Sequence, residues 1–120
     1  MRKDASKMIE KQVKKLEAND FVPTRKSETS GIMSKSLLPK DVSKVKVTLT
    51  HVMPGGKFPP HRDAYHHVFY VVRGKGEVYL GDETYDLEPG IIVEIPAKTL
   101  HGYQNTSDQL LELIVCNIPP

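Results

Sequence analysis

The chain has 120 residues, 38% of them apolar and 27% charged, with a net charge of +2. This length fits one domain, and no apolar run approaches the ~18 residues that a membrane-spanning helix needs, so no membrane partner is predicted. Residues 1–50 hold most of the basic side chains, but these are scattered without aromatic neighbours, so no nucleic-acid partner is predicted. Cys116 is the only cysteine, which excludes an intrachain disulfide and favours a reducing, cytoplasmic location.

Residues 1–30 are predicted to form an N-terminal arm, partly helix or strand, ahead of a β-barrel domain at residues 31–120. The arm is polar, and its apolar residues recur near helical spacing before Asn19 and Asp20, which are typical of a helix end. These apolar residues are Met8, Ile9, Val13 and Leu16. The alternative is a short edge strand over residues 13–16.

From Gly31 onward, short β-branched and aromatic runs alternate with Gly- and Pro-containing turns every ~8–12 residues, which predicts an all-β sandwich or barrel. The predicted strands are 32–38, 42–53, 68–72, 77–80, 84–87, 91–95, 102–105 and 110–117. In the second strand, one face carries Val45, Val47, Leu49, His51 and Met53, the period of a half-buried strand whose apolar face is expected inside. Small barrels with exposed edges often pair to cover them, so a homodimer is expected.

The stretch from Pro54 to Gly76 contains three of the five histidines. Its Gly- and Pro-rich start predicts a loop. His61, Asp63 and His67 share one parity, so in extended backbone they point to one side, whereas His66 points to the other. Imidazoles with a nearby carboxylate suit a divalent cation, so the sequence predicts a metal site.

The motif spacing resembles that of the cupin family. The residues at the spacing of its two motifs are Gly55, His61, Asp63, His67 and Gly74, followed by Gly90, Pro96, His101 and Asn105. The resemblance implies a double-stranded β-helix, or jelly-roll, barrel. It also implies that the metal ligands His61, Asp63, His67 and His101 face its interior.

Three positions depart from the family pattern. Asp63 stands where the family has histidine, His67 where it has glutamate, and Lys98 where it has glycine. The donor inventory of three imidazoles and one carboxylate is preserved. An aspartate carboxylate reaches roughly 2 Å less far than an imidazole Nε2. Asp63 therefore either ligates after an inward shift of its strand, or acts through water or by holding a ligand histidine.

Three histidines around one ion leave coordination positions open, as in catalytic sites. The first functional hypothesis is a mononuclear metalloenzyme, three-histidine dioxygenase-like, that acts on a small oxygen-rich molecule. His51 and Tyr103 are the proton-handling candidates for catalysis. Mixed nitrogen and oxygen donors suit Fe, Mn, Ni, Zn and Cu alike, so the metal stays open.

Two alternatives remain at this point. One is a non-catalytic module that binds a metal or a small ligand, including a metal-free barrel whose histidines are hydrogen-bonded core residues. The other is a sugar or sugar-phosphate isomerase, which needs a phosphate-binding cluster. Lys57, Arg62 and Lys98 are its candidates.

Overall fold

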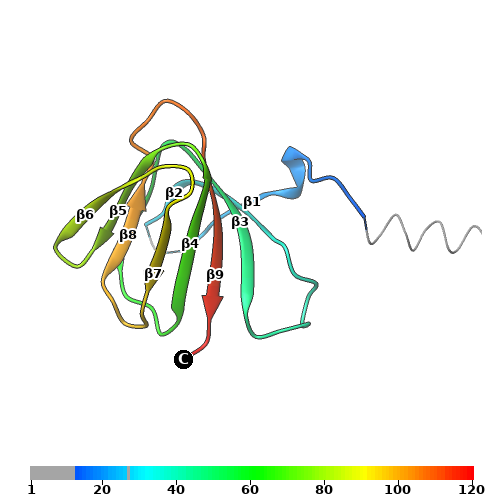
Figure 1. The fold of residues 1–120 in the computed structure, drawn as a ribbon. Coiled ribbons are helices and arrows are strands. Elements are labelled where there is room, and N and C mark those ends of the chain that lie inside the picture. Colours follow the sequence, from blue (N-terminus) through cyan, green and yellow to red (C-terminus); the bar gives the residue numbers. More distant parts are fainter. Residues whose placement is uncertain (1–12, 27) are drawn as a thin grey trace, which may run out of the picture.

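The computed structural model describes residues 13–26 and 28–120 and shows one strongly curled, antiparallel sheet (Figure 1). The strands are β1 (Val22–Pro23), β2 (Ser30–Ser36), β3 (Lys46–His61), β4 (His66–Arg73), β5 (Gly76–Leu80), β6 (Glu83–Leu87), β7 (Ile92–Ile95), β8 (His101–Gln104) and β9 (Leu111–Ile118). The prediction of an all-β fold is confirmed. No helix in the described part of the chain is long and apolar enough to span a membrane.

The strands follow the order β6-β5-β8-β3-β9-β4-β7, with β2 also paired to β3 and β1 to β2. Strand β3 joins the two halves of the sheet, because residues 46–52 pair with β9 and residues 57–61 pair with β8. The predicted loop at Pro54 is therefore wrong. The glycines bend the strand instead: Gly55 has a φ of 79°, and a Cβ on Gly56 would lie 2.6 Å from the Gly31 carbonyl oxygen.

The faces of β3 are the reverse of the prediction. Thr50 and Val52 are buried, whereas Leu49 and His51 on the expected inner face are only partly covered and Met53 is exposed. The threonines face the interior because this part of the half-barrel contains a polar cavity, not only an apolar core. The core itself consists of Ile32, Val52, Phe58, Phe69, Val71, Val78, Leu87, Val93, Ile95, Tyr103, Leu111 and Leu113.

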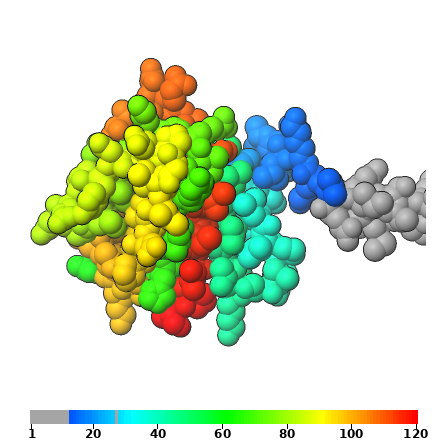
Figure 2. Space-filling view, in the orientation of Figure 1, coloured from blue at the N-terminus to red at the C-terminus, as the bar shows by residue number. Residues whose placement is uncertain are grey.

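The described part of the arm projects from the sheet on the side of β2 and β3, and only β1 joins the sheet (Figure 2). Residues 13–17 form neither a helix nor the alternative strand, and a single 3-10 turn, η1, follows at Ala18–Asp20. Met8 and Ile9, which belong to the predicted helix, lie outside the described residues. Strand β1 then pairs with β2 at Ser34 and Met33.

Candidate metal centre

A cavity of about 190 Å³ opens between the two halves of the curled sheet. Its lining combines aromatic rings, hydroxyl groups and a cluster of titratable side chains, and Phe58 of the aromatic part is stacked on His61. The lining residues are Thr24, Lys26, Ser34, Thr48, Thr50, Phe58, His61, Asp63, His67, Phe69, His101, Tyr103, Val115 and Asn117.

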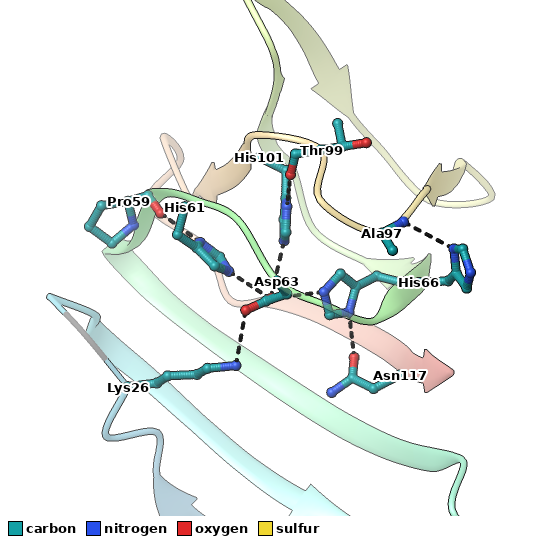
Figure 3. A network of polar contacts seen from close by, with 10 residues as sticks. Lys26, Pro59, His61, Asp63, His66, Ala97, Thr99, His101 and Asn117 are labelled. Atoms are coloured by element: carbon teal, nitrogen blue, oxygen red, sulfur yellow. Dashed lines mark hydrogen bonds and ion pairs between the residues drawn. The ribbon is translucent and has the colours of Figure 1, made fainter. Parts of the chain in front are cut away.

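Three histidines from three strands point at one carboxylate oxygen in this cavity (Figure 3). His61 ends β3 and lies opposite His101, the first residue of β8, while His67 lies near the start of β4. The distances from their Nε2 atoms to Oδ2 of Asp63 are 3.0 Å for His61, 2.9 Å for His67 and 3.7 Å for His101. The structure thus brings together all four residues predicted as metal ligands.

The outer nitrogen of each ring is occupied by a hydrogen-bond acceptor. Nδ1 of His61 donates to the Pro59 carbonyl (2.9 Å), and Nδ1 of His101 donates to the Thr99 carbonyl (2.8 Å). Nδ1 of His67 lies 2.7 Å from the Asn117 amide oxygen. Because a carbonyl oxygen only accepts, these contacts place a proton on Nδ1 of each ring and leave Nε2 facing Asp63, as a donor when it is protonated and as a metal ligand when it is not.

Asp63 lies in the loop between β3 and β4, not in a strand, so the inward strand shift that direct ligation was expected to require does not apply. Two hydrogen bonds to Lys98, in the second motif, hold this loop in place. The backbone N–H of Lys98 donates to the Asp63 carbonyl (2.7 Å), and the Arg62 side chain donates to the Lys98 carbonyl (2.8 Å). Lys98 occupies the family's glycine position and keeps a φ of 70°. These bonds stabilise a left-handed backbone that favours glycine.

The pKa values of Asp63 and His101 are shifted in the direction that metal ligation needs. Desolvation alone raises the pKa of Asp63, but the nearby charges of His61 and Lys26, with hydrogen bonds from His67 and His61, outweigh it and leave the pKa below its ordinary value. For His101, desolvation by burial lowers the pKa despite the hydrogen bond to the Thr99 carbonyl. At neutral pH Asp63 is therefore ionised and His101 is neutral.

The donor set fits a divalent transition metal. Ligand atoms of His61, Asp63 and His101 all lie within 4.8 Å of one another. His67 lies outside this mutually close group, yet its Nε2 is the nearest of the three to Asp63 Oδ2. The three Nε2 atoms converge on this one oxygen, where a cation can take the place of a shared proton.

The two proton-handling candidates lie in different places. Tyr103 lines the cavity between Phe58 and Phe69, with 4% of its surface exposed, and burial raises its pKa, so its hydroxyl stays neutral. His51 does not line the cavity. It points to the other face of β3, 2.6 Å from Glu112 and stacked on Phe21 of the arm.

Other motif residues have structural partners. His66 is exposed, as its parity predicts, and accepts a hydrogen bond from the Ala97 N–H. Asn105 is fully buried, and its amide joins β3 to the β8–β9 loop: it donates to the carbonyls of Val52 and Gln109 and accepts from the Ser107 N–H. The basic residues named for a phosphate site, Lys57, Arg62 and Lys98, are not among the residues that line the cavity.

Sequence reasoning missed Lys26, Thr24 and Asn117. Lys26 comes from the arm and approaches Asp63 Oδ1 at 3.4 Å across 37 positions of sequence. No local pattern marks such a contact. Asn117 was included in the last predicted strand, and its register opposite His67 follows only from the pairing of β4 with β9.

Comparison with known proteins places the chain in a family. Residues 48–117 match the cupin domain model, which is more than half of the sequence, so the chain belongs to the cupin family. The half-barrel is accordingly a cupin jelly-roll fold.

Two curated relatives also match parts of this chain. Auxin-binding protein 1 of Arabidopsis thaliana is 31% identical over 90 residues, which cover 66% of this chain and 45% of that protein. An uncharacterised protein of Methanocaldococcus jannaschii is 30% identical over 53 residues, 44% of this chain and 42% of that protein. The chain thus spans less than half the length of either relative.

Solved structures show the same fold. A polyketide cyclase from Streptomyces resistomycificus has a TM-score of 0.75 at 25% identity and covers 90% of this chain, which spans 82% of that one. A predicted oxalate decarboxylase from Thermotoga maritima has a TM-score of 0.75 at 18% identity, and the match covers 89% of this chain and 100% of that one. At this low identity the second match is evidence for the shared fold alone.

Proposed function

We propose that this cupin is a mononuclear metal-dependent enzyme, a three-histidine dioxygenase acting on a small oxygen-rich molecule. The observation that carries the proposal is the approach of three imidazole Nε2 atoms to one oxygen of Asp63. A bound ion would replace the protons that otherwise link these Nε2 atoms to the carboxylate, since each outer nitrogen already donates to an acceptor.

His61, His67 and His101 would hold the ion, and Asp63 would complete its ligand set. A bound iron would supply Lewis acidity toward a substrate oxygen and reactivity toward dioxygen. The backbone carbonyls of Pro59 and Thr99 and the amide of Asn117 fix the ring orientations. This preformed arrangement is what a catalytic centre requires of its surroundings.

The rest of the cavity supports binding of a compact substrate. Phe58, Phe69 and Tyr103 form an apolar wall that excludes water, and the neutral Tyr103 hydroxyl can donate a hydrogen bond to a substrate oxygen. One of the similar structures is named as a polyketide cyclase, and polyketides are oxygen-rich organic molecules. That name supports the substrate class only.

Oxygen uptake tests the enzymatic proposal. Protein loaded with Fe(II) without air is mixed with oxygenated buffer and a panel of small diketones, thiols and phenols. We expect uptake that depends on one substrate, is abolished in His61→Ala and is unchanged in the exposed control His66→Ala. Metal-loaded protein that is stabilised by panel members without any turnover would contradict the enzyme and favour a binding module.

A further inference from the structure

The N-terminal arm contributes one cation to the cavity. Strand β1 pairs with β2, and hydrogen bonds on either side of Lys26 hold the following turn: Thr24 N–H to the Ile32 carbonyl (2.9 Å) and Thr29 N–H to the Lys26 carbonyl (3.2 Å). Among the described residues that line the cavity, Lys26 is the only lysine or arginine. The arm therefore supplies the lysine that lines this cavity.

Lys26 meets the carboxylate of Asp63 on the side away from the histidines. Its Nζ lies 3.4 Å from Oδ1, whereas the imidazoles gather on Oδ2 (Figure 3). An ammonium group has three donors, and this contact uses one of them. The side chain is 54% exposed, so the remaining donors are open to an incoming ligand.

Hydroxyl groups line the same cavity as the Lys26 ammonium. Thr24 and Ser34 are hydrogen-bonded to each other at 3.2 Å, and Ser34 lies opposite Thr50 in the β2–β3 register. All three line the cavity. An ammonium and several hydroxyl donors in one cavity are suited to the oxygens of an anion, since charge-assisted hydrogen bonds are the stronger ones.

The cavity volume limits the ligand. An engineered apolar cavity of about 150 Å³ holds benzene, so about 190 Å³ admits a molecule of roughly six to ten non-hydrogen atoms. Phe58, Phe69 and Tyr103 form a wall suited to a flat apolar body. We infer that the substrate of the proposed metal centre is a small organic carboxylate, and that Lys26 is the specificity residue that binds its anionic end.

Benzoate and its neutral isostere benzamide test this inference, which rests on the proposed function. Calorimetric titration of Zn(II)-loaded protein should show that benzoate binds more tightly than benzamide. Lys26→Gln should weaken benzoate binding about tenfold to a hundredfold and leave benzamide binding unchanged. Lys26→Arg should restore most of the benzoate affinity. The matched control is Lys35→Gln on β2, outside this cavity, and it should behave as wild type.

Several results would overturn the role of Lys26. These are equal benzoate affinity in Lys26→Gln and Lys35→Gln, no preference of wild type for benzoate, or a loss of zinc in Lys26→Gln with the benzoate preference intact. The last result would make Lys26 a partner of Asp63 alone. Protein that takes up no zinc would refute the proposed function separately, and the same titrations on metal-free protein would then decide the role of Lys26.

Discussion

The amide of Asn117 provides a test of the metal centre that leaves every ligand in place. Its oxygen accepts from Nδ1 of His67 at 2.7 Å and so turns Nε2 toward Asp63. Asn117→Leu keeps the size of the side chain and removes the acceptor. Loss of such an outer partner typically lowers metal affinity 10- to 100-fold. At about 1.4 kcal/mol per factor of ten, this amounts to about 1.4–2.8 kcal/mol of binding free energy.

Competition for Zn(II) with a chromophoric chelator at neutral pH measures the affinity directly. The matched variant Asn117→Asp retains an acceptor, now charged, and should bind zinc at least as tightly as wild type. Thermal melting of the metal-free variants checks that the sheet is intact. If Asn117→Leu binds zinc within twofold of wild type while His101→Ala loses it, the proposed orientation of His67 by Asn117 is refuted.

Three other substitutions test the supports of the site. Asn105→Ala removes a buried amide that donates to two backbone carbonyls at 2.9 and 2.7 Å. Urea unfolding should therefore show a free energy of unfolding lower by about 2–4 kcal/mol. A decrease as small as that of the control Gln109→Ala would contradict this. Lys98→Gly relieves a φ of 70° and should raise stability by about 1 kcal/mol, whereas Lys75→Gly should give no gain. The lowered pKa of Asp63 means that its ionised form adds stability above about pH 4, which is lost as the pH falls through the lowered pKa. Metal-free Asp63→Asn should accordingly be less stable than wild type at pH 7 and match it in acid, and a deficit independent of pH would exclude this role.

The convergence of the ligands was predictable because it depends on motif spacing. His61, His67 and His101 recur at distances that place them near the ends of three strands, and the structure puts their rings around one point. The exchange of His and carboxylate positions was visible too. The position of Asp63 beyond the end of β3 could not be predicted, because no local sequence pattern marks a strand of 16 residues that changes partners midway.

The face of β3 was predicted wrongly for a physical reason. Alternating valine and leucine beside threonine normally marks the buried side, but a binding cavity reverses that rule by placing Thr48 and Thr50 inside. His51, which was expected in the interior, consequently lies on the other face of β3 and contacts Glu112. Lys26 could not be predicted, because its approach to Asp63 depends on how the arm pairs with β2.

Metal content is the most direct test of the central claim. Protein purified without added metal, and then after loading with Fe(II) or Zn(II) and removal of excess, is measured by elemental analysis. We predict close to one ion per chain in wild type and in His66→Ala, and far less than one in His61→Ala and His101→Ala. Equal metal content in all four proteins, or none in loaded wild type, would contradict the proposed centre.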